Sequence, residues 1–206
     1  RLKNLKNNLS IKRLCNKCEN DLNIQKLKKN YCIRIKVKNN NVVTIDDQIQ
    51  GKISVENKEI DNFIILRNDL TPTYMLSVVV DDNDMGVNNI IRGDDHLNNT
   101  FRQIQIYKHL DWKIPQYSHL PLIHGIDGIK LSKRHGAINI NEFKRNGYLP
   151  QSIVNNLILL GWSPNNKDEI INIDEIIDLF NIKKITKSAS IFDYKKLQHF
   201  NSFYLR

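Results

Sequence analysis

The sequence is poor in the features that mark membrane and secreted proteins. No stretch approaches the roughly 18 uninterrupted apolar residues that a membrane span requires, and the first residues lack the apolar core of a secretory signal. The three cysteines are odd in number and lie within the first 32 residues, which argues against a fold held together by disulfides. We therefore expect a cytoplasmic protein with reduced thiols and no contact with a membrane.

Ligands for a structural zinc ion are also scarce. Cys15 and Cys18 have the CxxC spacing of a zinc hairpin, but a tetrahedral site requires two further Cys or His ligands. Only Cys32 is near, and the next candidate, His96, lies in what we interpret as another domain. The sequence therefore predicts no protein-bound zinc.

An excess of positive charge is missing from most of the chain, although the net charge is +9. Residues 1–38 contain twelve Lys or Arg against two acidic residues, whereas residues 39–206 contain nineteen against twenty. An excess confined to one segment is the pattern expected of a surface that binds nucleic acid. A lysine-rich solvated face is the alternative, and charge alone leaves both interpretations open.

Short strands are predicted in the first third of the chain. Residues 32–38 alternate between apolar and polar side chains, which is typical of a half-buried strand. Further short strands are predicted at residues 42–45, 51–55 and 63–66, with Asn and Asp supplying the turns between them. This part favours a small mixed or antiparallel sheet.

After residue 66 strands and helices are expected to alternate. Residues 74–80 are apolar enough for a buried strand or a buried helix, and the pattern does not decide between them. Strands are predicted at 89–92 and 119–123. A helix is predicted at 98–110, with Phe101, Ile104 and Leu110 facing inward and Arg102, Gln105 and Lys108 facing outward. This order indicates an α/β fold whose parallel strands carry the ligand at their carboxyl ends.

The strand pattern stops beyond Gly136. Amphipathic helices are predicted at residues 141–145, 150–160, 173–180 and 193–200. We therefore expect residues 141–206 to form an all-helical module.

A lysine-rich run carries the clearest chemical signal. Lys130-Leu131-Ser132-Lys133-Arg134 places three cations and a hydroxyl within five residues, after the turn-prone segment 125–128. Cleavage of ATP between its α and β phosphates loads negative charge onto the departing pyrophosphate, and preorganised ammonium groups stabilise that charge. A solvated surface loop is the alternative for these residue types taken alone.

The lysine run is preceded by further blocks in a specific order. These blocks are Thr71-Pro72-Thr73-Tyr74, Val78-Val79-Val80-Asp81-Asp82, Met85-Gly86, Ile91-Arg92-Gly93-Asp94-Asp95-His96-Leu97 and Leu120-Pro121-Leu122-Ile123. In this order and spacing they resemble glutamyl-tRNA synthetase, a class I aminoacyl-tRNA synthetase, and KLSKR resembles the KMSKS signature of that family. The resemblance extends from about Cys18 to Arg206. One block is a weak signal, and the shared register of all of them makes the resemblance specific.

The resemblance implies a fold for each part of the chain. Residues 1–66 correspond to part of the insertion that binds the acceptor end of tRNA. Residues 67–140 correspond to the second half of the Rossmann-type catalytic domain, and residues 141–206 to a helical domain that contacts the tRNA stem. The sequence contains no HIGH-type signature, whose histidines contact ATP in this family. The resemblance therefore implies a fragment that lacks the first half of the catalytic site and is inactive alone.

The resemblance also implies roles for individual residues. Tyr74 and Arg92 match positions that bind the side-chain carboxylate of glutamate, and a guanidinium fork suits a planar anion. Asp95 and Ile123 match positions that contact the adenosine part of ATP. The loop completes the ATP site with Lys130, Leu131, Ser132, Lys133 and Arg134. Lys130 and Lys133 are the residues expected to act in catalysis, by stabilising pyrophosphate.

Each of these assignments has a structural alternative. Arg92 could be a strand-end arginine paired with Asp94 or Asp95. Tyr74 could be a core or rim residue, because most tyrosines are. Asp95 could cap the helix that follows it, and Ile123 could belong to the core.

The activity implied by the resemblance is that of a glutamate–tRNA ligase, which joins L-glutamate to the 3′ end of tRNA-Glu through glutamyl-adenylate. ATP is a substrate that brings its own Mg²⁺. We assign no metal to Asp81, Asp82 or Asp84, because three acids around a turn are more often capping and solvated groups. The full-length enzyme is expected to be a monomer. A tRNA-binding fragment without catalytic activity and a relative of glutaminyl-tRNA synthetase remain alternatives.

Overall fold

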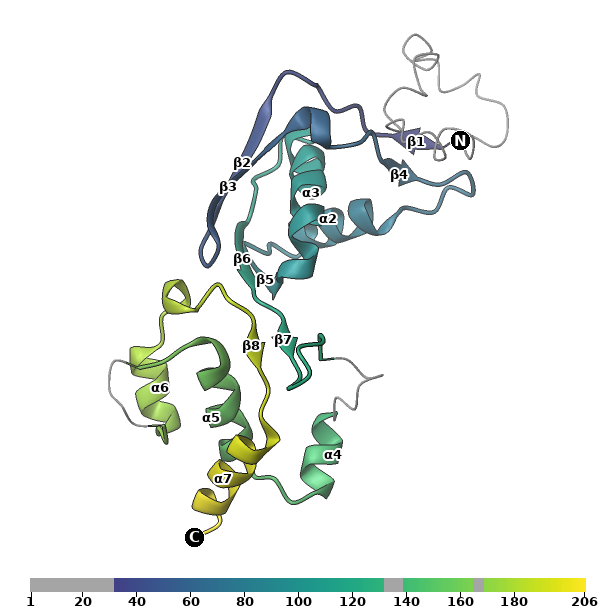
Figure 1. The fold of residues 1–206 in the computed structure, drawn as a ribbon. Helices are drawn as coiled ribbons and strands as arrows, with labels where there is room; N and C mark the ends of the chain where they lie inside the picture. The colour runs from purple at the N-terminus through teal and green to yellow at the C-terminus, as the bar shows by residue number, and fades with distance from the viewer. Residues whose placement is uncertain (1–31, 132–138, 165–168) are drawn as a thin grey trace. The chain divides into compact units, whose positions relative to one another are not determined.

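The computed structural model describes residues 32–131, 139–164 and 169–206, and contacts among the residues divide the chain into two compact units (Figure 1). The described part of unit 1 is residues 32–46, 52–90 and 96–117, and that of unit 2 is residues 47–51, 91–95, 118–131, 139–164 and 169–206. The chain therefore passes between the units several times. This division does not test the predicted domain boundaries at residues 66 and 140, which stay predictions.

Two small sheets form the first part of unit 1. β1 (Ile33–Arg34) pairs antiparallel with β4 (Ile64–Leu66). β2 (Val42–Asp47) pairs with β3 (Gly51–Glu56), and the short helix η4 (Asn57–Glu59) follows. The period of two in β2 buries Val43 and Ile45, as the sequence predicts for a strand with one face in the core.

The strand predicted at residues 32–38 is much shorter than expected. β1 ends at Arg34, and the pairing register shifts between Ile33 and Arg34. The Ile35 N–H donates to the Phe63 carbonyl at 3.1 Å, but the Val37 N–H donates to the side chain of Asn62 at 2.9 Å. A side-chain amide thus replaces a strand neighbour, which the alternating pattern cannot indicate.

Two helices complete the core of unit 1. α2 (Tyr74–Asp84) decides the ambiguity of residues 74–80 in favour of a helix, and it begins directly after Pro72 and its cap residue Thr73. α3 (Leu97–His109) buries Phe101 and Ile104 as predicted. These helical residues pack with Val79 of α2 and with the buried residues of the two sheets.

The predicted faces of α3 are partly wrong. Leu110, expected inward, follows the last helical residue and is 42% exposed. Gln105, expected outward, is buried, and its amide donates to Oδ1 of Asn57 at 3.1 Å. A polar side chain can be buried when another element supplies its hydrogen-bond partner, and helical periodicity says nothing of that partner.

Unit 2 contains the ends of two paired strands and a second pair of strands. β5 (Asn89–Gly93) pairs with β6 (Gln116–Leu120), and the last residues of both belong to unit 2. The short helix η5 (Asp94–His96) follows β5 directly. β7 (Ile123–His124) pairs in parallel with β8 (Ser190–Ile191), so two segments far apart in the sequence lie side by side.

Helices account for most of the remaining structure in unit 2. They are α4 (Ile140–Arg145), α5 (Pro150–Gly161), α6 (Ile173–Leu179), η7 (Ile182–Lys184) and α7 (Tyr194–Tyr204). None of the helices that the structure describes is long and apolar enough to cross a membrane.

The expected all-helical module at residues 141–206 is not confirmed, because β8 lies between η7 and α7. The Phe192 N–H donates to the carbonyl of His124 at 2.8 Å, which extends the pairing with β7. Phe192 itself is buried with Phe143 and Leu197. A strand of two residues is too short to leave a periodic signal in the sequence.

Candidate active site

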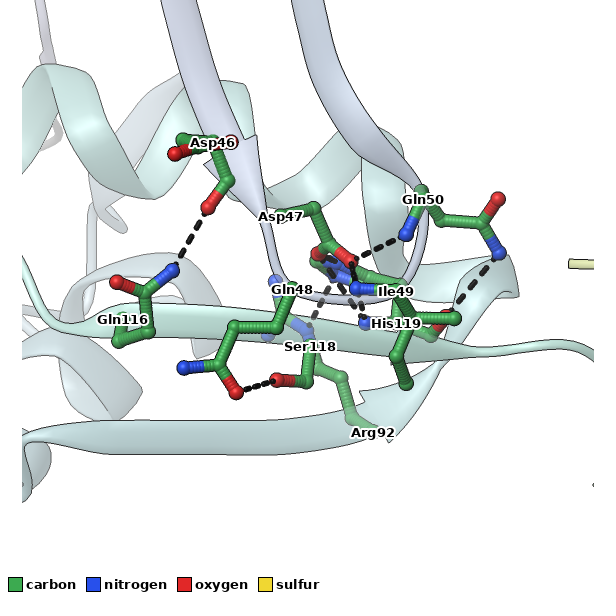
Figure 2. A network of polar contacts seen from close by, with 9 residues as sticks. All are labelled: Asp46, Asp47, Gln48, Ile49, Gln50, Arg92, Gln116, Ser118 and His119. Atoms are coloured by element: carbon green, nitrogen blue, oxygen red, sulfur yellow. Dashed lines mark hydrogen bonds and ion pairs between the residues drawn. The ribbon is translucent and has the colours of Figure 1, made fainter. Parts of the chain in front are cut away.

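Arg92 and His119 lie side by side on the paired strands β5 and β6 (Figure 2). The Nε–H of Arg92 donates to Nε2 of His119 at 3.2 Å. The imidazole is fully buried, whereas Arg92 is half-buried. The residue expected to bind the carboxylate of glutamate therefore has a buried histidine partner, which the sequence does not indicate.

Asp47 extends this contact into a chain of three side chains. Its Oδ2 accepts from Nδ1 of His119 at 2.6 Å, and both side chains are fully buried. The same carboxylate accepts from the backbone N–H groups of Ile49 at 3.0 Å, Gln50 at 2.9 Å and His119 at 3.1 Å. Four donors from two segments hold this carboxylate, which lies at the end of β2 (Figure 2).

The protonation of the buried pair follows from its surroundings. Burial by itself raises the pKa of Asp47, but the hydrogen bonds from Gln50, His119 and Ile49 outweigh burial and hold that pKa below its usual range. For His119 burial is the largest cause, and it lowers the pKa below 6.5; Arg92 acts in the same direction, whereas Asp47 and Asp94 oppose it. At neutral pH the pair is therefore a carboxylate and a neutral imidazole.

The tautomer of His119 is fixed by its two neighbours. A carboxylate only accepts hydrogen bonds, so Nδ1 of His119 carries the proton that is donated to Asp47. Nε2 is then the unprotonated nitrogen, and its lone pair accepts from the Nε–H of Arg92. Each of these contacts has one donor and one acceptor.

The lysine run begins on the second leg of a tight hairpin. The Gly125 N–H donates to the Ile129 carbonyl at 2.8 Å, and the Leu131 N–H donates to the Ile123 carbonyl at 2.8 Å. Gly128 has φ +75°, a conformation that residues with a side chain adopt rarely. The hairpin turn therefore depends on glycine, and it places Lys130 opposite His124 of β7.

Lys130 meets Asp95, which lies 35 residues earlier in the chain. Lys130 Nζ is 2.7 Å from Asp95 Oδ2, and the two side chains are 50% and 38% exposed. Gly93 permits this arrangement, because a Cβ at that position would lie 2.6 Å from Asp95 Oδ1. Two residues predicted to bind ATP, from different blocks of the sequence, are thus brought into contact.

The remaining predicted site residues are placed as follows. Ile123 lies on β7, and its side chain packs on the core that contains Phe143 and Phe192. Ile123 is therefore a core residue, and its contact with ATP stays a prediction. Tyr74 is the first residue of α2 in unit 1 and is 51% exposed. Leu131 packs against the same core as Ile123. The predictions for Ser132, Lys133 and Arg134 lie outside the described residues.

No group of three or more His, Cys, Asp or Glu residues that could hold a metal is found in residues 32–131, 139–164 and 169–206. Cys15 and Cys18, the pair with zinc-like spacing, lie outside these ranges. ATP stays the only predicted carrier of Mg²⁺.

Sequence reasoning missed both Asp47 and His119. They are 72 residues apart, and neither belongs to a recognisable block together with the other. The one available signal was that His119 begins the strand predicted at 119–123, and an ionisable side chain needs a partner if such a strand is buried. The sequence does not say which residue that partner is.

Comparisons with known proteins identify the family of the chain. The sequence matches the family described as tRNA synthetases class I (E and Q), catalytic domain, over residues 2–199. The chain belongs to this family. As a class I tRNA synthetase chain it is 51% identical over 177 residues to glutamate–tRNA ligase 2 of Zymomonas mobilis and 49% identical over 174 residues to glutamate–tRNA ligase of Azorhizobium caulinodans. These matches cover 85% and 84% of the chain.

Solved structures of class I tRNA synthetases resemble the chain as well. A crystal structure of a glutamate tRNA ligase from Elizabethkingia meningosepticum in complex with its amino acid superposes with a TM-score of 0.78 at 31% identity. This match covers 85% of the chain and 39% of the solved protein. The chain likewise spans about 37% of the length of the two curated relatives, so the activity of the whole relatives does not transfer to it directly.

Proposed function

We propose that the chain carries the carboxylate-binding arginine and the pyrophosphate-binding lysine loop of a glutamate–tRNA ligase. The convergence of Arg92, Asp95 and Lys130 within unit 2 is the observation that carries this proposal. Relatives with that name at 51% and 49% identity support it independently.

In the proposed reaction, an oxygen of the α-carboxylate of glutamate attacks the α-phosphorus of ATP, while Arg92 holds the side-chain carboxylate. The bond between the α-phosphorus and the oxygen that bridges to the β-phosphorus breaks, and pyrophosphate leaves. The terminal ribose hydroxyl of the tRNA then attacks the carbonyl carbon of glutamyl-adenylate, and AMP leaves. Positioning and charge stabilisation carry both steps, so no nucleophilic side chain is required.

Arg92 would select the amino acid in this scheme. Its guanidinium is planar and always charged, and two parallel N–H groups match the two oxygens of a carboxylate. A neutral amide in the same place would offer one oxygen and no charge. The half-buried position of Arg92 strengthens this preference, because partial exclusion of water weakens the screening of charges.

Lys130 would move from Asp95 to the phosphates. An ion pair as exposed as Lys130–Asp95 contributes about 0–1 kcal/mol, so it can open at little cost. A polyphosphate carries several negative charges and competes well with one carboxylate for the ammonium group. The Asp95 carboxylate is proposed to accept a hydrogen bond from the ribose of ATP once the pair has opened.

The tRNA is the proposed partner of the basic segment at residues 1–38, which carries the charge excess of the chain. Because the chain spans about 37% of the length of its curated relatives, we propose that turnover requires the part of the catalytic site that those relatives contain in addition. Binding of tRNA without turnover is the second candidate function for the chain by itself.

The proposal is tested by grafting the chain into the Zymomonas mobilis relative in place of the segment that it matches. Glutamate-dependent exchange of pyrophosphate into ATP is then measured for the chain alone and for the graft. We expect exchange from the graft and none from the chain alone. Lys133→Ala in the graft should lower the exchange rate by roughly 10²- to 10³-fold, the usual loss for one preorganised charge-stabilising group.

Lys144→Ala is the matched control, because Lys144 is an exposed lysine of α4 outside the loop, and its removal should leave the exchange rate unchanged. A folded graft without exchange would refute the proposed function. A graft that exchanges with glutamine in preference to glutamate would instead favour the glutaminyl-tRNA synthetase alternative.

A further inference from the structure

The buried contact between Asp47 and His119 is costly for the fold and calls for an explanation. Both side chains are fully buried, and a buried ionic or strongly polar pair stabilises a fold no better than apolar residues of the same size. Yet the carboxylate is held by four hydrogen-bond donors. What this arrangement presents to its surroundings is the Nε2 lone pair of His119, to which Arg92 donates.

We propose that Asp47 and His119 are positioning residues that fix the guanidinium plane of Arg92 and thereby help the site distinguish an anionic amino acid from a neutral one. This inference rests on the proposed function for the assignment of Arg92 to the amino-acid site. Asp47 and His119 are both fully buried, and in this proposal they act on the substrate only through Arg92.

First, the Asp47 carboxylate and the turn that carries it are held rigidly. Asp47 accepts from Ile49 and Gln50 of its own turn, which fixes the carboxylate to the backbone. The amide of Gln50 donates to the carbonyl of His119 at 3.1 Å, and Lys187 donates to the carbonyl of Gln50 at 3.0 Å. The turn between β2 and β3 is therefore tied to β6 and cannot shift without breaking several of these bonds (Figure 2).

The second step is the orientation of the imidazole. Its Nδ1–H and its own backbone N–H both bind the same Asp47 carboxylate, so the ring has no freedom to flip. A carboxylate that accepts from one ring nitrogen of a histidine fixes the tautomer and the direction of the opposite ring nitrogen. The lone pair of Nε2 therefore has a fixed position and points toward Arg92 on β5.

The third step is the effect on Arg92. The guanidinium is planar, and a hydrogen bond at its Nε–H fixes the rotation of that plane. An arginine side chain loses rotamer freedom when it is ordered, and one that is already anchored has less to lose when substrate binds. A carboxylate needs two parallel N–H groups, so it gains more from a fixed plane than a neutral amide does.

The matched variants His119→Asn and His119→Gln separate this role from packing. The amide of Asn occupies the place of Nδ1, so it keeps the contact with Asp47 and loses the acceptor for Arg92. The amide of Gln reaches the place of Nε2 and offers an oxygen to the Nε–H of Arg92, but it loses the contact with Asp47. Both variants remove an aromatic ring from the same buried position, so any general loss of packing is similar.

The first measurement uses the full chain. Nitrogen-15 spectra report the arginine Nε–H groups, and we expect the Arg92 signal to be protected from exchange with water in the unmodified chain. It should stay protected in His119→Gln and lose protection in His119→Asn. Equal protection in both variants would overturn the proposed contact, whatever the activity of the protein.

The second measurement uses the graft and compares kcat/KM for glutamate and glutamine in pyrophosphate exchange. His119→Asn should lower the value for glutamate by roughly 10- to 100-fold, the loss expected for one hydrogen bond to a charged group, and lower the value for glutamine much less. His119→Gln should lose less than His119→Asn with glutamate, because it keeps an acceptor for Arg92 although it loses the contact with Asp47. In an Arg92→Ala background the two variants should no longer differ.

Losses of equal size for both amino acids would show that His119 is merely structural and would overturn the specificity role. A graft that is folded and inactive with His119 in place would refute the proposed function instead, and the protection of the Arg92 Nε–H would still decide whether His119 holds the arginine.

Discussion

Replacing Arg92 by alanine gives the sharpest test of the amino-acid site. Removal of one partner from a buried ion pair costs about 3–5 kcal/mol, because the other charge stays buried without compensation. Arg92 is half-buried, so solvent screens part of this cost and the lower end of that range applies. About 3–4 kcal/mol corresponds to a loss of roughly 10²- to 10³-fold in kcat/KM for glutamate.

The assay is amino-acid-dependent pyrophosphate exchange by the graft, with glutamate and glutamine measured side by side. Glutamine carries no charge on its side chain and should lose much less, so the ratio of the two kcat/KM values should narrow. Arg102→Ala is the control, since Arg102 belongs to unit 1, where its guanidinium pairs with Asp61 at 2.9 Å. That variant should leave the ratio unchanged.

Arg92 does not bind the amino acid if Arg92→Ala lowers kcat/KM equally for glutamate and glutamine, since a misfolded site would do the same. An unchanged kcat/KM for glutamate would exclude Arg92 as well. If Arg102→Ala also changed the ratio of kcat/KM for glutamate to that for glutamine, the ratio would respond to the loss of any arginine and would not report on the amino-acid site.

Further predictions concern stability and tRNA binding. The unfolding free energy of the chain, measured in urea at a series of pH values, should fall as the pH drops below about 6.5. The cause is that His119 takes up a proton in the unfolded chain at a higher pH than in the folded chain, where its pKa is lowered. His119→Gln should reduce this pH dependence. Asn201→Ala should destabilise unit 2 by about 2–3 kcal/mol in the same assay, since it removes the acceptor of the Leu149 N–H and the donor to the Gly147 carbonyl. Ser202→Ala on the exposed side of α7 should change little. Affinity for tRNA should fall with salt at a log–log slope of about −0.7 to −0.9 per neutralised phosphate, and a flatter slope is expected after neutralising Lys26, Lys28 and Lys29. An unchanged slope would make the basic segment a solvated face.

The fold was predictable where a periodic pattern was long. α5 and α7 carry repeating apolar faces over three turns, and the sequence places both within a few residues of their true ends. Short or irregular elements were not predictable. β8 has only two residues. The strand expected at 32–38 ends at Arg34, and the Val37 N–H beyond it donates to the side chain of Asn62.

The candidate site was predictable to the extent that it consists of sequence blocks. Arg92, Asp95 and Lys130 each belong to a block, and the structure places Lys130 in contact with Asp95; their assignment to ATP stays a prediction. The pair of Asp47 and His119 was not predictable, because its existence depends on two segments 72 residues apart being buried against each other. Burial of charge is a property of the folded chain and is decided by tertiary contacts.

The hairpin that carries Lys130 has a consequence for how this segment can change during evolution. β7 is joined on one edge to β8 and on the other to the leg at residues 129–131, and it is only two residues long. One residue added to or removed from the turn would shift the pairing by one position and turn Lys130 to the opposite face, away from Asp95. Substitutions should be tolerated at Ile126, which is 73% exposed, whereas insertions and deletions between residues 124 and 130 should be absent from any functional descendant.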